Sequence, residues 1–258
     1  MTPWEEPPAD GPTGPPETPR PVAVKLSEAI GAVALFALTQ LALSFITVGI
    51  VRVFGLAEDA ASRELVIRIA LPTALLGSQA IGWWAAWYVV RRRHGLPFPA
   101  ALGLSLPLPR GLPRAFLGGM LLQVAVLLIV VLLPPPPDMV SPLERLLRQG
   151  PWAMWLVLVV AVVIAPFVEE VLFRGLLLGA LRRYWPFPLA ALAVTLLFTA
   201  LHASQTRSYL PALAGIFLCG WVLATLRERS GSLWPPVALH MGFNAMAFLP
   251  ILLAAGLR

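Results

Sequence analysis

The chain has 258 residues, of which 58% are hydrophobic and 12% are charged, and its formal net charge is +6. Soluble domains carry about 25% charged residues, so this composition excludes a soluble monomer and indicates a membrane protein. We interpret the excess positive charge as arginine at the ends of membrane spans, not as a nucleic-acid-binding surface. The single cysteine, Cys219, lies in an apolar run, which disfavours a disulfide framework, a thiolate metal cluster and redox chemistry.

The N-terminal segment, residues 1–22, is rich in proline, glycine and acidic residues and has no periodic apolar pattern. Such a composition cannot bury enough apolar surface to fold, so we expect a disordered, Pro-rich cytoplasmic tail. A basic start leading into an apolar core is missing from it, so we do not expect a signal peptide.

Apolar runs long enough to cross a bilayer follow, and they predict an all-α, polytopic transmembrane bundle of about seven to eight helices. A short segment at 141–150 mixes leucine with charged residues, and we expect it to form an amphipathic helix on the membrane surface. The apolar runs cover residues 27–51, 69–90, 112–133, 151–181, 187–203, 209–226 and 236–256.

The distribution of basic residues predicts the orientation of these spans. With the N-terminus in the cytoplasm, eleven Lys and Arg residues lie on the cytoplasmic side and seven lie on the opposite side. Because cytoplasmic loops collect positive charge, we expect a multi-pass protein of a bacterial inner or cell membrane with a cytoplasmic N-terminus.

A few polar side chains interrupt the later spans. A charge at bilayer depth costs about 2.5–3.5 kcal/mol or more, so each one is a candidate for function. Structural alternatives exist, because an intramembrane Glu–Arg pair or a lone histidine or asparagine can simply hold helices together. The candidates are Glu169, Glu170 and Arg174 in the fourth run, His202 in the fifth, and His240 and Asn244 in the seventh.

Helical spacing separates the roles of the two adjacent carboxylates. Glu170 and Arg174 are four residues apart and share a helix face, so they can neutralise each other. Glu169 is turned by about 100° from that face, so it is the less compensated carboxylate and the better base. The same four-residue spacing relates Phe198 to His202 and His240 to Asn244.

Depth in the membrane gives a second geometric expectation. Glu169 and His202 are about equally far from the turn between their spans, near 185–186, so an antiparallel hairpin predicts that they are level. Centring each span on its apolar midpoint instead places His202 and His240 toward opposite sides, more than about 10 Å apart in height. An extended fourth span or a shifted fifth span would remove this conflict.

Three motifs in order resemble the pattern of the CPBP family. They are Glu169-Glu170-x-x-x-Arg174, Phe198-x-x-x-His202 and His240-x-x-x-Asn244. The family, also called Abi, comprises intramembrane proteases related to CAAX prenyl endopeptidases and bacteriocin-processing or immunity proteins. The resemblance covers roughly residues 154–250. It implies a helical bundle whose residues 151–258 form the catalytic core. Outside the resemblance, we expect residues 23–150 to form the first three helices and the amphipathic segment.

The resemblance also implies a role for each residue in an intramembrane endopeptidase. Glu169 would be the general base that activates water, and His202 would hold that water. His240 and Asn244 would stabilise the oxyanion. The supporting residues would be Glu170 and Arg174 as a paired carboxylate and cation, and Phe198 as a packing residue.

Two chemistries remain open for this residue set. We favour a mechanism without a metal cofactor, because no H-E-x-x-H motif is present and each histidine has few acidic partners to fix its tautomer. The alternative is a zinc site formed by Glu169, His202 and His240 with water as the fourth ligand.

The partners and the competing functions follow from the same pattern. We expect contact with the lipid bilayer and a peptide or protein substrate, which can be lipidated or membrane-anchored, and no nucleic acid. One alternative is a non-catalytic immunity or scaffold protein of the same fold. Another is a proton-coupled transporter that uses Glu169 and His202 as a relay, although the chain has no visible internal repeat.

Overall fold

A computed structural model describes residues 24–53, 60–104, 108–136, 155–156, 158–204, 206 and 209–256. The tail at 1–22 and the amphipathic segment at 141–150 lie outside these residues, so both expectations stay predictions.

The described residues are helical and contain no strand, which confirms the predicted all-α class. The apolar runs expected from the sequence coincide with helices, and most helix ends fall within a few residues of the expected ones. The first half contains α1 (Leu26–Val53), α2 (Ala60–Trp87) with its π-helical extension η1 (Tyr88–Arg93), α3 (Phe98–Leu102) and α4 (Leu112–Leu132). The second half contains η2 (Val159–Ile164), α7 (Ala165–Glu170), η3 (Val171–Leu177), α8 (Leu178–Leu181), α9 (Phe187–His202), α10 (Leu210–Ser230) and α11 (Trp234–Gly256).

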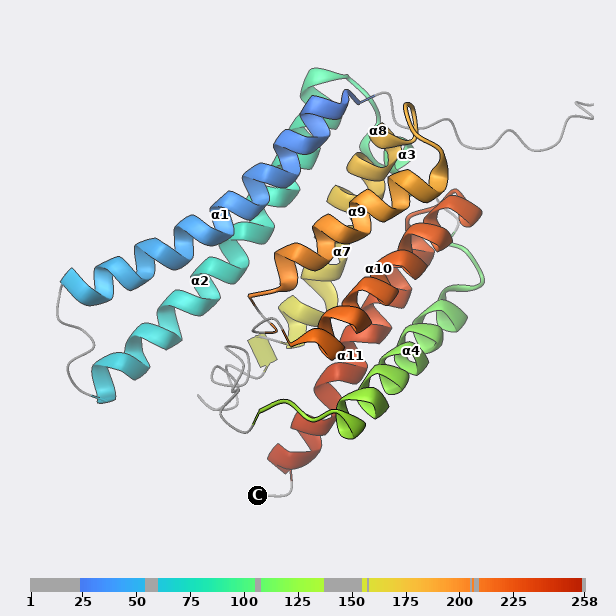
Figure 1. Ribbon diagram of the computed structural model, residues 1–258. Helices are drawn as coiled ribbons and strands as arrows, with labels where there is room; N and C mark the ends of the chain where they lie inside the picture. Colours follow the sequence, from blue (N-terminus) through green and yellow to red (C-terminus); the bar gives the residue numbers. More distant parts are fainter. Residues whose placement is uncertain are drawn as a thin grey trace, which may run out of the picture.

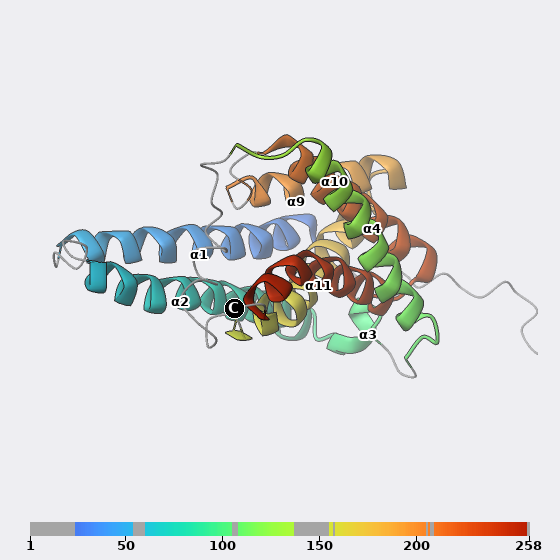
Figure 2. The same cartoon turned by 90° about the horizontal axis from the view of Figure 1, so that it is seen from below.

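The helix that runs through η2, α7, η3 and α8 occupies the centre of the bundle. In Figures 1 and 2, α1 and α2 lie side by side and α4 lies against α11, with the yellow helix that contains α7 between these two pairs. This central helix contacts α1, α2, α9, α10 and α11. Every residue of η3 is buried, so the predicted motif of the fourth run lies in the most enclosed part of the fold.

The outer surface of the bundle is apolar, as expected for a protein surrounded by lipid. Three described segments are long and apolar enough to cross a membrane: Leu26–Leu43 of α1, the whole of α4 and the whole of α10. Large apolar side chains on the outer helices are exposed, for example Phe45 in α1 and Leu121 in α4. Exposing so much apolar surface to water is unfavourable in free energy, whereas lipid solvates it, so the fold is a helical membrane bundle.

The central helix departs from regular α geometry on both sides of α7, in η2 and in η3. Pro166, in the first turn of α7, has no N–H to donate to the carbonyl of Val162, and its ring crowds that carbonyl. The preceding six residues, η2, adopt the wider π form, which accommodates this crowding. The predicted fourth span is therefore helical but not uniformly α-helical.

Two glycines fix where α11 begins and therefore the position of its polar residues. Gly231 ends α10 in the left-handed conformation, with φ of 63°, and Gly103 ends α3 with φ of 68°. The carbonyl of Gly103 accepts hydrogen bonds from the Leu233 N–H and the Ser232 hydroxyl, both at 3.0 Å. These hydrogen bonds to the Gly103 carbonyl thus hold the turn before α11 against the end of α3.

Glycine also allows α4 and α11 to pack backbone against backbone. A Cβ atom at Gly119 of α4 would lie 1.9 Å from the carbonyl oxygen of Leu239. A Cβ atom at Gly242 of α11 would lie 2.0 Å from the carbonyl oxygen of Phe116. Such contacts between small residues are a common way to join helices in membranes. Here they hold the part of α11 that contains His240 and Asn244.

Gly119→Ala is expected to separate α4 from α11 and to lower the free energy of unfolding by about 1–3 kcal/mol, the usual cost of overpacking. The matched control is Gly118→Ala, because nothing lies within 4 Å of a Cβ atom at the adjacent position. Thermal unfolding in detergent measures both variants. Equal midpoints for the two substitutions would contradict the close crossing of α4 and α11.

Candidate active site

A buried ion pair lies at the centre of the site. Glu170 in α7 and Arg174 in η3 have side chains with no exposed surface, and Nη1 of Arg174 donates to Oε1 of Glu170 at 2.8 Å. The guanidinium also donates through Nη2 to the carbonyl of Gly220 in α10 at 3.0 Å. Its carbon lies 4.6 Å from the ring centre of Phe198, within range of a cation–π contact. The predicted pairing of Glu170 with Arg174 is confirmed.

The same carboxylate also holds His240. Nδ1 of His240 lies 3.0 Å from Oε1 of Glu170. A carboxylate that pairs with Arg174 can only accept a hydrogen bond, so Nδ1 of His240 carries the proton and donates it. This leaves Nε2 as the ring nitrogen that faces Glu169. Glu170 is therefore more than a partner for arginine, because it also sets the orientation of the imidazole.

His202, the last residue of α9, is oriented in an equivalent way. Its Nδ1 lies 2.7 Å from the backbone carbonyl of Phe198, one turn earlier. Because a carbonyl can only accept, Nδ1 donates and Nε2 again faces Glu169. The ring of Phe198 packs 4.4 Å from the imidazole, centre to centre, so the predicted packing partner contacts both His202 and Arg174.

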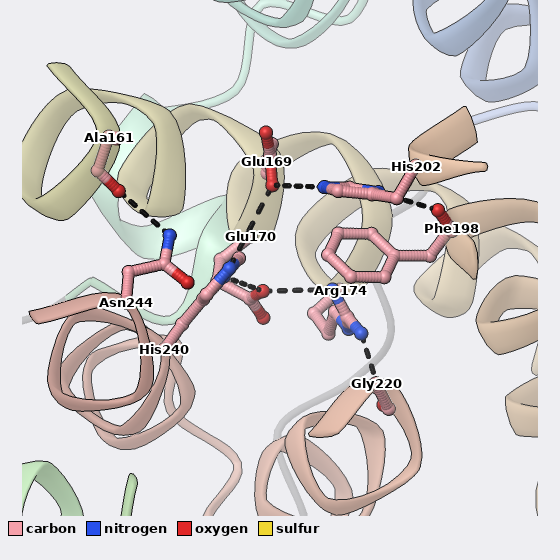
Figure 3. A network of polar contacts seen from close by, with 9 residues as sticks. All are labelled: Ala161, Glu169, Glu170, Arg174, Phe198, His202, Gly220, His240 and Asn244. Carbon is pink, nitrogen blue, oxygen red and sulfur yellow. Dashed lines mark hydrogen bonds and ion pairs between the residues drawn. The ribbon is translucent and has the colours of Figure 1, made fainter. Parts of the chain in front are cut away.

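Glu169 lies between the two histidines (Figure 3). Its Oε2 is 3.9 Å from Nε2 of His202 and 3.9 Å from Nε2 of His240. These distances are too long for direct hydrogen bonds. The side chain of Glu169 is 11% exposed, whereas that of Glu170 is fully buried, so the outer carboxylate is the accessible one. The expected division between a paired and a less compensated carboxylate agrees with these contacts.

The expected difference in height between His202 and His240 is wrong. Both imidazoles face the same oxygen atom of Glu169, and the predicted level pairing of Glu169 with His202 holds. The physical reason is that helices of a membrane bundle tilt and shift along one another as they pack, so the depth of a residue does not follow from its place in its own span. A tilted helix covers less depth per residue than an upright one, so midpoints of hydropathy give wrong relative heights.

Asn244 makes a contact that the sequence did not indicate. Its Nδ2 donates to the backbone carbonyl of Ala161 in η2 at 2.7 Å, so the side chain ties α11 to the central helix (Figure 3). A primary amide has two N–H donors, and this contact uses one of them. The predicted oxyanion role of Asn244 stays a prediction, with a structural contact added to it.

Sequence reasoning missed the partners that act through their backbone. The carbonyl groups of Gly220, Phe198 and Ala161 each accept a hydrogen bond from a polar side chain of the site. Backbone carbonyls leave no pattern in a sequence. Gly220 alone offers a hint, because a Cβ atom there would lie 3.3 Å from Nη2 of Arg174 and 3.0 Å from Cγ2 of Thr195.

The donor types of Glu169, His202 and His240 suit zinc. Acidic partners are few, as expected: Nδ1 of His240 pairs with Glu170, and Nδ1 of His202 pairs with a backbone carbonyl. Either kind of acceptor can orient a histidine that binds a metal, so this scarcity does not argue against zinc. The spacing is less suitable, because ligand atoms of a tetrahedral zinc site lie about 3.3 Å apart. Within the described part of the chain, no three His, Cys, Asp or Glu residues are placed to hold a metal ion. We therefore derive no step through a metal.

Comparison with known proteins places these residues in a family. Residues 151–246 match the family described as "Type II CAAX prenyl endopeptidase Rce1-like", and this range contains every polar residue of the site. The region is similar to an Rce1-like domain. The resemblance expected from the three motifs is confirmed for this part of the chain.

Two curated relatives are similar to part of the chain. An "Uncharacterized 24.3 kDa protein" of Escherichia coli is 44% identical over 96 residues, which are 36% of this chain and 43% of that protein. The "Putative membrane peptidase YdiL" of Bacillus subtilis (strain 168) is 28% identical over 97 residues, 38% of each chain. The similarity thus spans less than half of either relative. No solved structure shows a significant match.

Within the Rce1-like region, Glu170→Gln is expected to act mainly through stability. It leaves the charge of Arg174 buried and unpaired, and breaking a buried pair in this way costs about 3–5 kcal/mol. Adding Arg174→Met removes the stranded charge and is expected to recover at least half of that loss. Glu169→Gln is the matched control, with a much smaller effect on unfolding in detergent. Equal destabilisation by the two glutamine variants would contradict the division between the carboxylates.

Proposed function

We propose that the chain is an intramembrane endopeptidase in which Glu169 activates a water molecule for attack on a peptide bond. The observation that carries the proposal is the convergence of three side chains from three helices. Oε2 of Glu169 and the Nε2 atoms of His202 and His240 face one point, each nitrogen 3.9 Å from the oxygen. The match to the Rce1-like endopeptidase family and the name of the Bacillus relative support the same reaction class.

The distances suit a bridging water. A water molecule about 2.8 Å from both Oε2 of Glu169 and Nε2 of His202 fits atoms that are 3.9 Å apart. Nε2 of His202 carries no proton, because Nδ1 donates to the Phe198 carbonyl, so the water donates one hydrogen to each of these acceptors. A water that donates both hydrogens presents its oxygen lone pair to a substrate carbonyl.

The proposed reaction then proceeds through a tetrahedral intermediate. The water oxygen bonds to the carbonyl carbon while its proton passes to Glu169, and the former carbonyl oxygen becomes an oxyanion. The unused N–H of Asn244 is the proposed donor to this oxyanion. His240, whose Nε2 also faces this point, is proposed to stabilise the oxyanion together with Asn244. When the C–N bond breaks, Glu169 returns the proton to the leaving amine.

The proposed setting is a bacterial membrane with the N-terminus in the cytoplasm. Arg91, Arg92 and Arg93 are exposed at the end of η1, next to the tryptophan and tyrosine side chains at the end of α2. This arrangement of aromatic and basic residues is typical of a cytoplasmic membrane boundary. We propose a membrane-associated peptide or protein as the substrate, which can be lipidated or held by its own membrane segment.

Glu169→Gln is expected to lower turnover by at least about 10²-fold, because it keeps the shape of the side chain and removes the base. A substrate is first identified as a membrane peptide or protein that accumulates uncleaved in cells with the Glu169→Gln variant, by proteomic comparison of their termini. Turnover is then measured with purified protein in lipid vesicles. Wild-type turnover by Glu169→Gln in that assay would refute the role of this residue.

Asn244→Ala distinguishes the two chemistries left open by the sequence. With a water activated by Glu169, the loss of one oxyanion donor is expected to lower turnover by about 10²–10³-fold. The variant also leaves the Ala161 carbonyl without its donor, so stability falls by about 1–3 kcal/mol. Turnover is therefore expressed per folded protein, from the unfolding curve of the same sample.

Zinc content and chelators provide the complementary measurement. The proposed mechanism predicts activity that survives EDTA and phenanthroline, with far less than one zinc ion per chain by elemental analysis. Stoichiometric zinc that is lost with activity on chelation and restores it on readdition would overturn the proposal in favour of a metal site. In that case His202→Ala and His240→Ala would abolish zinc binding.

A further inference from the structure

The aromatic ring of Phe198, in α9, contacts three polar side chains of the site. Its centre lies 4.4 Å from the centre of the His202 imidazole and 5.8 Å from that of His240. The guanidinium carbon of Arg174 lies 4.6 Å from the same ring centre. Among the ring contacts of the described residues, those of Phe198 alone include both imidazoles. The ring is therefore placed to influence both histidines that face Glu169.

His202 has fewer restraints on its imidazole than His240 has. It is the last residue of α9, and its side chain is 18% exposed, against 4% for His240. Within the described part of the chain, its imidazole makes one hydrogen bond, from Nδ1 to the Phe198 carbonyl. One hydrogen bond holds a single ring nitrogen and leaves the plane of the ring free to swing about it. A second contact is needed to fix where Nε2 points.

The ring of Phe198 provides that second contact. It packs against the imidazole of His202 with an angle of 39° between the two planes. Figure 3 shows the ring between His202 and Arg174, so that the cation–π contact holds it from the other side. Arg174 is itself fixed by hydrogen bonds to Glu170 and to the carbonyl of Gly220. The buried ion pair thus restrains the ring, and the ring restrains the imidazole.

We infer that Phe198 is a positioning residue, whose ring fixes the plane of the His202 imidazole so that an unprotonated Nε2 faces Glu169. The inference rests on the proposed function, in which this Nε2 accepts a hydrogen from the attacking water. Without the ring, the imidazole can swing away from the Phe198 carbonyl, and the proton that Nδ1 donates there can move to Nε2. A protonated Nε2 no longer accepts that hydrogen. Phe198 would then act on the reaction without contacting the substrate.

The first test observes the imidazole directly, by nitrogen NMR of protein with ¹⁵N-labelled histidine in lipid nanodiscs. The spectrum distinguishes a ring nitrogen that carries a proton from one that does not. The chain has three histidines, and His202→Gln identifies the signals of His202 by their loss. At about pH 8, above the ordinary pKa of histidine, we expect one tautomer of His202 in the wild type, with the proton on Nδ1. We expect Phe198→Leu to populate both tautomers.

The matched control is Phe173→Leu in η3. Phe173 is 1% exposed and Phe198 is 2% exposed, so both substitutions remove the same ring from the core. The ring of Phe173 packs edge to face on that of Phe198, at 5.2 Å and 87°, and makes no described ring contact with an imidazole. We expect Phe173→Leu to keep the single tautomer of His202.

A second variant without the ring, Phe198→Met, separates loss of the ring from loss of the fold. Methionine is unbranched and fills irregular space in a core, but it has no planar face to set against an imidazole. We expect Phe198→Met to populate both tautomers of His202, as Phe198→Leu does. Thermal unfolding of each labelled sample shows that the spectrum belongs to folded protein.

The second test measures turnover of the substrate that accumulates with Glu169→Gln. A misplacement of about 1 Å in a reacting group can cost about 10²-fold in rate, so we expect kcat of Phe198→Leu to fall by about 10- to 10²-fold per folded protein. KM should stay close to the wild-type value, because the buried ring does not reach the substrate. Phe173→Leu should keep kcat close to that of the wild type.

Three results would overturn the inference. Both ring-free variants of Phe198 could keep the single tautomer of His202 while folded. Phe173→Leu could change the His202 signals as much as Phe198→Leu does, as expected if the ring only fills the core. The tautomers could mix in Phe198→Leu while kcat stays at the wild-type value. The first two results need no substrate, so they are independent of turnover by Glu169→Gln, which decides the proposed function.

Discussion

One oxygen atom organises the polar interior of this membrane bundle. Oε1 of Glu170 accepts hydrogen bonds from Arg174 at 2.8 Å and from His240 at 3.0 Å, and both partners are buried. A buried carboxylate is costly unless it is paired and hydrogen-bonded, so the guanidinium makes its presence possible. The imidazole then uses the same oxygen to fix which of its nitrogens faces outward. The geometry around Glu169 thus depends on a neighbouring carboxylate that is itself fully buried.

Backbone contacts between the helices also fix the positions of the polar side chains of the site. α11 begins at a turn tied to Gly103 and lies directly against α4 at Gly242, so its polar face has little freedom to rotate. The central helix is fixed by burial on every side of η3. Both α11 and the central helix are therefore held in place, and their polar side chains lie within contact distance of one another.

Much of this arrangement could be predicted from the sequence, because charge is so scarce in the spans. The spacing of Glu170 and Arg174 is sufficient to predict their pairing, and it leaves Glu169 as the accessible carboxylate. The relative depth of His202 and His240 could not be predicted, because it depends on how the helices tilt and shift along one another when they pack. The π-helical segments around α7 and the bonds to the carbonyls of Ala161 and Gly220 escaped prediction for a related reason. They are formed by backbone groups, which are nearly the same in every residue and therefore leave no pattern in the sequence.

Leu76, Trp83 and Val163 line an apolar cavity of about 590 Å³ and are exposed on the apolar outer surface of the bundle. In a bilayer this opening is in contact with lipid and not with water. A molecule that reaches the cavity from that side first partitions into the bilayer and then diffuses in two dimensions. Its encounter rate depends on its mole fraction among the lipids, so adding protein-free lipid to the same vesicles dilutes it. For such a molecule, insertion into the bilayer precedes any contact with the protein.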